Sequence, residues 1–236
     1  MTTSFYVRLA GPLQSWAGAS VTGNIVHTEL EPTRSGLVGL LAGACGYYRG
    51  EWPSWLDDLV FIVRNDNRGM LTDDFQTINP PTVEKEFKRG LSIALGRSIR
   101  AKDALTHTPA GPTKKGARTA VITRTYIANG EFLVQITSNE HVDQIREALK
   151  NPVFTSYLGR KAFAPTFPFV LGEGSPAALA KIPVYRPHDR SGAPSARLQL
   201  KHLAPGVPPL ADITTVPTVR SRGEWLDAVR SMLNPL

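Results

Sequence analysis

The succession of predicted elements along the chain is the feature that most narrows its possible folds. Alternating apolar residues predict a strand over 4–10, the run LVFIVRND predicts a strand over 59–66, and 127–138 contains a third around Phe132, Val134 and Ile136. Helix-period spacing predicts helices over 33–46 and 141–151. This order, with a long insertion after the second strand, is expected for a ferredoxin-like α+β unit. With 236 residues, 42% of them apolar, the chain is long enough to bury a substantial core around such a sheet.

The first predicted helix carries three glycines on one face, Gly36, Gly39 and Gly43. Each glycine costs a helix roughly 1 kcal/mol relative to alanine, so their recurrence needs a reason. A helix face without side chains allows another backbone to come close, whether a strand, a second helix or a phosphate chain. Tight packing of the helix on its sheet is the simpler interpretation, and a binding site is the other.

The same helix opens with Arg34 and Ser35. A helix N-terminus presents free N–H groups and a partial positive charge, which favour an anion. An arginine there opposes the usual preference for acidic residues. Its placement is explained if a phosphate lies between the Arg34 guanidinium and the helix amides.

The net charge of +7 is concentrated in parts of the chain. Residues 84–124 contain ten basic and three acidic side chains, and residues 151–236 carry a further excess of positive charge. Clustered basic charge is typical of nucleic-acid-binding proteins, although a solvated basic surface has the same composition. We interpret the insertion, about 70–126, as a projecting hairpin with its tip near 107–117 and a strand returning over 119–127. A disordered segment without function is the alternative.

The last part of the chain is rich in proline and poor in predicted helix. The segments KIPVYRP (181–187) and ARLQLKHL (196–203) each predict a strand, and a short terminal helix is predicted over 221–233. We therefore expect a main domain at 1–172, which includes the insertion, and a C-terminal extension at 173–236 that adds strands to the same sheet.

The segment YLGRKAFAPTFPFVLG (157–172) combines residue types that suit single-stranded RNA. Tyr157 can stack on a base, Gly159 permits close backbone approach, and Arg160 and Lys161 can contact phosphates. A turn with two solvated cations gives the same pattern, so this segment alone is a weak signal.

Signals for catalysis and for metal binding are poor. The single cysteine, Cys45, excludes an internal disulfide framework and a cysteine-based zinc site, and the five histidines lack metal-ligand spacing, so no cofactor is predicted. A metal-independent ribonuclease would need a base for a 2′-hydroxyl and an acid for the leaving oxygen. The side chains that could supply these groups are His27 or His107 with Lys114 or Lys115 and Tyr47 or Tyr48.

The N-terminus lacks the pattern of a signal peptide, and no apolar run approaches the ~20 residues needed to cross a bilayer. We therefore expect a soluble, cytoplasmic protein with no membrane contact.

Three segments, occurring in this order, are RLAGPLQSW (8–16), EPTRSGLVGLL (31–41) and YLGRKAFAPTFP (157–168). Together they resemble the CasD subunits of type I-E CRISPR Cascade surveillance complexes, which belong to the RAMP superfamily. The similarity runs from residue 5 to about residue 172. The insertion matches in position and basic character, and the family commonly has glycine where this chain has Ala17.

The resemblance implies an RRM-like RAMP domain with a protruding basic thumb. It also implies a non-catalytic subunit that grips the 5′ handle of the CRISPR RNA and caps one end of the backbone filament. Such a subunit would contact the CasC backbone subunit and the large CasA subunit, and would meet target DNA only through the complex. In related type I-C systems the equivalent subunit cuts the precursor RNA, so an endoribonuclease is one alternative. A general basic RNA-binding protein is the other.

The resemblance also assigns residues by position. The predicted contacts to the handle are Gln14, Trp16, Arg34, Ser35, Gly36, Tyr157, Gly159, Arg160 and Lys161. The thumb cations predicted to contact the RNA backbone are Lys114, Lys115, Arg118 and Arg124.

Overall fold

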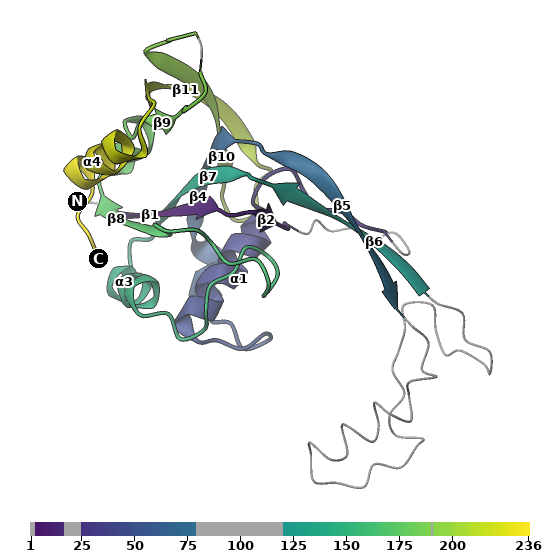
Figure 1. Cartoon of the computed structure of the whole chain (residues 1–236). Coiled ribbons are helices and arrows are strands. Elements are labelled where there is room, and N and C mark those ends of the chain that lie inside the picture. Colours follow the sequence, from purple (N-terminus) through teal and green to yellow (C-terminus); the bar gives the residue numbers. More distant parts are fainter. Residues whose placement is uncertain (1–2, 17–24, 79–119, 190) are drawn as a thin grey trace, which may run out of the picture.

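The computed structural model describes residues 3–16, 25–78, 120–189 and 191–236 (Figure 1). Its centre consists of two strand–helix–strand units, in chain order β1 (Ser4–Ala10), α1 (Arg34–Cys45) and β4 (Val60–Asn67), then β7 (Glu131–Thr137), α3 (Val142–Lys150) and β8 (Val170–Gly174). The four strands lie in the order β8-β1-β7-β4, and each is antiparallel to its neighbours. The predicted α+β succession therefore forms one antiparallel, curled sheet with α1 and α3 on the same face.

The C-terminal part of the chain continues this sheet. Its elements are η3 (Pro176–Ala180), β9 (Val184–Tyr185), β10 (Ser195–Leu203), β11 (Leu210–Val219) and α4 (Arg222–Met232). The strand β10 pairs with β4, β11 pairs with β10, and β9 pairs in parallel with the end of β11. The predicted strands at 181–187 and 196–203 correspond to β9 and β10. The strand β11 was not predicted, because the prolines before and within it suggest a loop.

The insertion begins and ends as a β-hairpin. The strands β5 (Met70–Ile78) and β6 (Ala120–Ala128) pair antiparallel over their whole length and project from the main sheet (Figure 1). Two short strands, β2 (Leu13–Gln14) and β3 (Ile25–Val26), pair with the other side of β6. The predicted returning strand is therefore β6, whereas the predicted tip near 107–117 lies outside the described residues.

The two faces of the main sheet bury two separate apolar cores. Along β1, Phe5, Val7 and Leu9 point toward α1 and α3, and Tyr6 points to the opposite face, where Trp225 of α4 is fully buried. Adjacent strand residues face opposite sides of a sheet, so one strand contributes to both cores. Among the described residues, no helix combines the length and hydropathy that a membrane crossing requires.

Candidate nucleic-acid interface

The three sequence segments of the predicted site meet at one place. The backbone N–H of Ser15 donates a hydrogen bond to the carbonyl oxygen of Leu158 at 3.0 Å, which joins the loop after β1 to the loop before β8. The indole of Trp16 then lies against the first turn of α1, where a Cβ at Gly36 would be 2.9 Å from the ring. Further backbone hydrogen bonds, from Thr166 to Ala10 and from Arg8 to Phe169, join the same two stretches of chain, so segments far apart in the sequence are held together.

Gly159 is required where these loops meet. Its φ is +86°, a left-handed conformation that only glycine adopts readily. A Cβ on this residue would lie 1.6 Å from the carbonyl oxygen of Ser15, which is closer than any real contact. The residue predicted to allow an RNA backbone to approach in fact allows its own protein backbone to approach.

Gln14 and Trp16 are part of the core, which corrects their predicted role. Both side chains are buried, and the Trp16 Nε1–H donates to Gln14 Oε1 at 3.0 Å. The Gln14 amide in turn donates to the carbonyl oxygens of Leu9 and Gly130. Because these hydrogen bonds use their polar groups, the two side chains support the loop from beneath and have no polar group left for a ligand.

Arg34 also differs from its predicted role. Its guanidinium donates to the backbone carbonyl oxygens of Asp57 and Leu59, at the end of the 3₁₀ helix η1 (Ser54–Asp58). The arginine thus connects the start of α1 to the chain entering β4. A phosphate is not needed to explain its position, and the first helical turn is capped by Thr33, whose hydroxyl accepts from the Gly36 N–H.

The glycine face of α1 is partly packed and partly open. Gly36 lies against Trp16, as described above, and a Cβ at Gly39 would touch Trp52 at 3.4 Å. A Cβ at Gly43 would have no neighbour within 4 Å. Close packing therefore explains the first glycine, whereas Gly43 faces free space.

That free space is a groove of about 1410 Å³, which we call the α1 groove. One wall is the glycine face of α1 with the segment after it, and the other is the loop 153–161. Its described lining contains two cations and neither a carboxylate nor a histidine. The residues that line it are Ser15, Trp16, Thr33, Ser35, Gly36, Gly39, Leu40, Gly43, Tyr47, Tyr48, Arg49, Gly50, Trp52, Val153, Phe154, Thr155, Ser156, Tyr157, Gly159 and Lys161.

Several groove residues are available to a ligand. Ser35, Tyr157 and Lys161 are exposed, and all three were predicted from the sequence. Tyr48 is also exposed, and its ring packs against Phe154 with the centroids 5.4 Å apart. Exposed rings beside cations are the combination that binds unstacked bases and their phosphates.

The part of the α1 groove that follows α1 was not predicted from the sequence. Arg49 and Trp52 were not predicted as ligand contacts, although both line the groove. The signal that could have found them is the run YYRGEW (47–52), which places aromatic residues and a cation directly after a glycine-faced helix.

The remaining predicted cations are not in the α1 groove. Arg160 points to the base of the β5–β6 hairpin, where its guanidinium donates to the Tyr126 hydroxyl and lies over that ring. Arg124 is half-buried on β6, opposite Asp74 of β5. The predicted contacts Lys114, Lys115 and Arg118 lie outside the described residues. Lys161 and Arg160, although adjacent, thus face different parts of the molecule.

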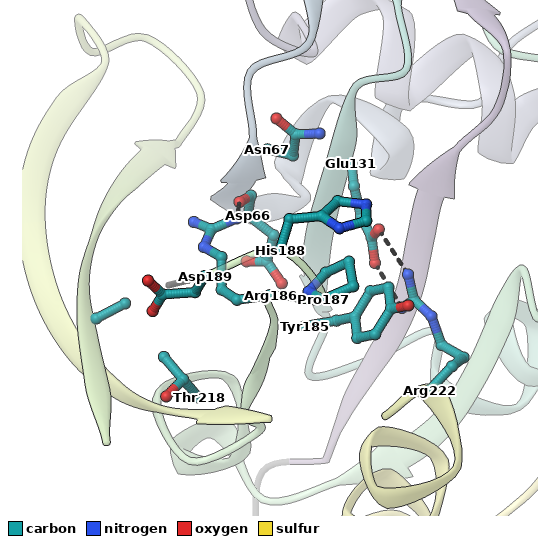
Figure 2. A pocket seen from close by; sticks show the side chains of 11 residues that line it. Asp66, Asn67, Glu131, Tyr185, Arg186, Pro187, His188, Asp189, Thr218 and Arg222 are labelled. Atoms are coloured by element: carbon teal, nitrogen blue, oxygen red, sulfur yellow. Dashed lines mark hydrogen bonds and ion pairs between the residues drawn. The ribbon is translucent and has the colours of Figure 1, made fainter. Parts of the chain in front are cut away.

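A second cavity, of about 580 Å³, lies on the other side of the sheet beside α4 (Figure 2). Figure 2 shows Glu131 paired with Arg222, and the same carboxylate also accepts from Arg8 at 2.8 Å. The Arg222 guanidinium lies 3.9 Å from the centre of the Tyr185 ring. Burial by itself would raise the pKa of Glu131, but hydrogen bonds from Arg222 and Arg8 outweigh it, so the pKa is lowered overall.

Other charges around this second cavity are also paired. Asp66 accepts two hydrogen bonds from the fully buried Arg64, at 2.6 and 2.8 Å. Arg64 donates further to the carbonyl oxygens of Leu179 and Ile182, and Arg186 donates to the backbone oxygen of Asp66. The cavity is therefore bounded by ion pairs that hold the C-terminal elements on the sheet.

The structure offers no assembled metal or acid–base centre in the parts it describes. Within those residues, no group of three or more histidine, cysteine or carboxylate side chains could hold a metal ion. Of the ribonuclease candidates, Tyr47 and Tyr48 line the α1 groove. His27 is exposed and is not in its lining, and His107, Lys114 and Lys115 lie outside the described residues.

Comparison with known proteins identifies relatives whose similarity extends over most of the chain. The family model described as "CRISPR-associated protein (Cas_Cas5)" matches residues 5–232. The chain is 28% identical over 179 residues to the "CRISPR system Cascade subunit CasD" of Escherichia coli (strain K12), covering 73% of this chain and 71% of that one.

Two solved structures extend the similarity to the fold. One chain of a "CRISPR RNA-guided surveillance complex" has a TM-score of 0.74 and 27% identity, and the match covers 96% of this chain and 99% of that one. A "Crystal structure of Cas protein" has a TM-score of 0.55 and 25% identity, covering 91% and 95%. The similarity therefore includes the C-terminal strands, which the sequence segments left out.

Proposed function

The chain belongs to the Cas5 family of CRISPR-associated proteins, and on that premise we propose that it is an RNA-binding subunit of a Cascade surveillance complex. In this proposal it holds the 5′ handle of the CRISPR RNA in the α1 groove and caps one end of the backbone filament. Its central sheet is a ferredoxin-like unit of the RAMP type, and the β5–β6 hairpin is the base of the thumb.

The observation that carries this proposal is the convergence of the three family segments on the α1 groove. The groove combines exposed aromatic rings with Arg49 and Lys161, and its described lining has no carboxylate to repel a phosphate. Stacking of a base on an aromatic ring contributes about 1–3 kcal/mol and does not require a particular base. Such a groove suits a single strand whose bases are unstacked, as in an RNA handle.

The proposed neighbours are the CasC backbone subunit and the large CasA subunit. Arg160 and Arg124 lie by the β5–β6 hairpin and not in the groove, so we assign them to the thumb side of the RNA path. Target DNA would meet this chain only through the assembled complex. The proposed role is structural, with the RNA held and not cut.

The test is a binding and cleavage assay on the purified protein. Fluorescently labelled repeat RNA that ends in the 5′ handle is compared with a scrambled strand of the same composition, without added metal. Anisotropy reports binding, and a denaturing gel of the same samples reports cutting. We expect preference for the handle RNA and no cleavage.

Single substitutions then locate the site. Tyr157→Ala should weaken handle binding by about 1–3 kcal/mol through loss of stacking. Lys161→Ala should weaken it by about 1 kcal/mol and reduce its salt dependence, because one phosphate contact is lost. The matched control is Lys181→Ala, an exposed lysine after η3 on the opposite face of the sheet, which should leave affinity unchanged.

Three outcomes would contradict the proposal in different ways. Equal affinity for handle and scrambled RNA would favour a general basic RNA-binding protein. Specific cleavage within the repeat would favour the endoribonuclease alternative. If neither Tyr157→Ala nor Lys161→Ala affects handle binding, the RNA binds elsewhere than in the α1 groove.

A further inference from the structure

The loop 157–163 belongs to one wall of the α1 groove and carries two exposed side chains of that wall, Tyr157 and Lys161. Its two ends are joined, because the backbone N–H of Leu158 donates to the carbonyl oxygen of Phe163 at 2.8 Å. A loop whose ends are joined in this way is compact. The contacts that hold its outer end therefore set the position of both exposed side chains.

A tyrosine of the projecting β5–β6 hairpin makes those contacts. Tyr126 of β6 is only 3% exposed, and its ring packs edge to face against Phe163, with the centroids 4.9 Å apart and the planes at 82°. The Arg160 guanidinium donates to the Tyr126 hydroxyl and lies 5.6 Å from the centre of the same ring. Both arrangements are favourable for an aromatic ring, so two residues of the loop are fixed on one side chain of the hairpin.

The Tyr126 hydroxyl also reaches the second strand of the hairpin. A phenolic hydroxyl can donate one hydrogen bond while it accepts another. It donates to Oδ2 of Asp74 on β5 at 3.4 Å, and accepts from Arg160. The hydroxyl thus links the loop to both β5 and β6.

Tyr126 does not itself line the α1 groove. Because its side chain is buried against the outer end of the loop, it can influence a ligand in the groove only through that loop. The opposite wall, which carries Arg49, is formed by α1 and the segment after it, and none of the Tyr126 contacts described above reaches that wall. A change at Tyr126 should therefore affect one wall and not the other.

We propose that Tyr126 is a positioning residue for the α1 groove, an inference that rests on the proposed function because handle RNA is the ligand whose binding Tyr126 would alter. The tyrosine holds the loop 157–163 so that Tyr157 and Lys161 face the RNA. Its place on β6 makes the base of the hairpin and this wall of the groove one binding unit. The guanidinium of Arg160 serves to fix the loop, while its neighbour Lys161 remains available to a phosphate.

The test is a double-mutant cycle on the full chain, with labelled handle RNA as the probe and anisotropy as the measurement. Lys161→Ala and Arg49→Ala are each measured alone and in combination with Tyr126→Leu. Alone, each cation substitution should weaken binding about fivefold, because one phosphate contact is lost. Tyr126→Leu alone should weaken binding at least tenfold, because it removes the contacts that place the loop.

The combined variants show whether Tyr126 acts through the loop. Together with Tyr126→Leu, Lys161→Ala should weaken binding by less than a further twofold, because the displaced lysine no longer contacts the RNA. Arg49→Ala should keep its fivefold effect, because its wall is unchanged. A role of Tyr126 in general stability would leave both cation substitutions with their full effects, since the effects of independent sites add.

A milder pair of variants tests the hydroxyl without removing a ring. Tyr126→Phe keeps the aromatic packing and loses the hydrogen bond from Arg160, so handle binding should weaken about threefold. The matched control is Tyr6→Phe. Tyr6 is also buried, and its hydroxyl donates to the carbonyl oxygen of Ser175 at 2.6 Å on the α4 side of the main sheet. Tyr6→Phe should leave RNA affinity unchanged.

The proposal is overturned if Lys161→Ala keeps its fivefold effect in combination with Tyr126→Leu. It is also overturned if Tyr126→Phe and Tyr6→Phe change RNA affinity to the same extent. Handle binding that responds to Lys161→Ala and Arg49→Ala, but not to either Tyr126 variant, overturns this inference alone. If neither cation substitution has an effect in the otherwise unmodified chain, the RNA does not use the α1 groove, and the proposed site fails together with this inference.

Discussion

The two cavities of this protein lie on opposite faces of one sheet and are built on opposite principles. The α1 groove is lined by aromatic rings and two cations, and no carboxylate in its described lining neutralises them. The cavity beside α4 contains more charge, but Glu131 holds Arg8 and Arg222, and Asp66 holds Arg64. The cations of the α1 groove are therefore available to a ligand, whereas those around the cavity beside α4 are held in ion pairs within the protein.

The difference shows that the number of arginines near a cavity is a poor guide to a binding site. An arginine that is paired and buried contributes to the fold, and its pairing would have to be broken before it could bind a phosphate. Lys161 is exposed on a short loop and is free of that cost. Substitutions on the two faces should therefore differ, with the larger loss of stability on the face that carries the ion pairs.

The largest expected effect is on stability, from the ion-pair face. Glu131→Ala removes the carboxylate that joins β7 to Arg8 of β1 and Arg222 of α4, and leaves two guanidinium groups without their partner. We expect the free energy of unfolding to fall by about 3 kcal/mol, measured by urea denaturation. Handle RNA affinity of the folded fraction should remain unchanged, because the α1 groove is on the other face.

The control for that experiment is a solvent-exposed ion pair of the same helix. Asp227 and Arg230 of α4 lie 3.9 Å apart with both side chains largely exposed. Asp227→Ala should change stability by about 0.5 kcal/mol or less. If the two variants lose equal stability, the ion pairs around Glu131 are not what holds α4 on the sheet.

The next effect in size is at the junction beneath the α1 groove. Gly159→Ala adds a Cβ that would overlap the Ser15 carbonyl oxygen at a φ of +86°, so the loop must move. We expect about 2 kcal/mol of lost stability and at least tenfold weaker handle binding, by denaturation and anisotropy. The movement separates Tyr157 and Lys161 from α1.

Gly206 provides the matched control for this variant. It also has a positive φ, +70°, but a Cβ there would have no neighbour within 4 Å. Gly206→Ala should therefore cost about 1 kcal/mol of backbone strain and leave RNA affinity unchanged. Equal loss of RNA affinity in both variants would mean that global strain, and not the junction with Ser15, weakens binding.

Much of the fold could be predicted because it depends on local patterns. The helix period over 33–46 and the apolar alternation at 4–10 identify α1 and β1 within one or two residues. The strand β11 could not be predicted in this way. Its residues are mostly exposed and include a proline, so its identity as a strand comes from pairing with β10, which no local pattern records.

The three segments quoted from the sequence do meet in the structure, whereas their role as an RNA site stays a prediction. The resemblance placed the right segments together, and the family is confirmed. It could not distinguish a residue that faces a ligand from one that supports it. Trp16 packs against Gly36 and Arg34 donates to the Leu59 carbonyl oxygen, and these long-range contacts cannot be read from the segments themselves.

A change of pH should have a smaller effect on stability, and this effect should come from Glu131 on the face that carries the ion pairs. Because the pKa of Glu131 is lowered in the folded protein, its contribution to stability is present above the ordinary carboxyl pKa and is lost as the pH falls through the lowered value. Urea midpoints between pH 7 and pH 3 should therefore fall more steeply for the unmodified protein than for Glu131→Gln. Parallel pH profiles for the two proteins would contradict this account.

The smallest expected effect concerns the glycine at the open end of the α1 face. Gly43→Ala adds a methyl group where nothing lies within 4 Å, so the helix should gain about 0.5–1 kcal/mol of stability. Gly36→Ala should lose stability instead, because its Cβ would lie 2.9 Å from the Trp16 ring. If RNA approaches the open part of the face, Gly43→Ala should bind the handle more weakly although it unfolds at higher urea. A variant that is more stable and binds equally well would show that the RNA path bypasses Gly43, and would limit the groove to the end formed by Ser35, Tyr157 and Lys161.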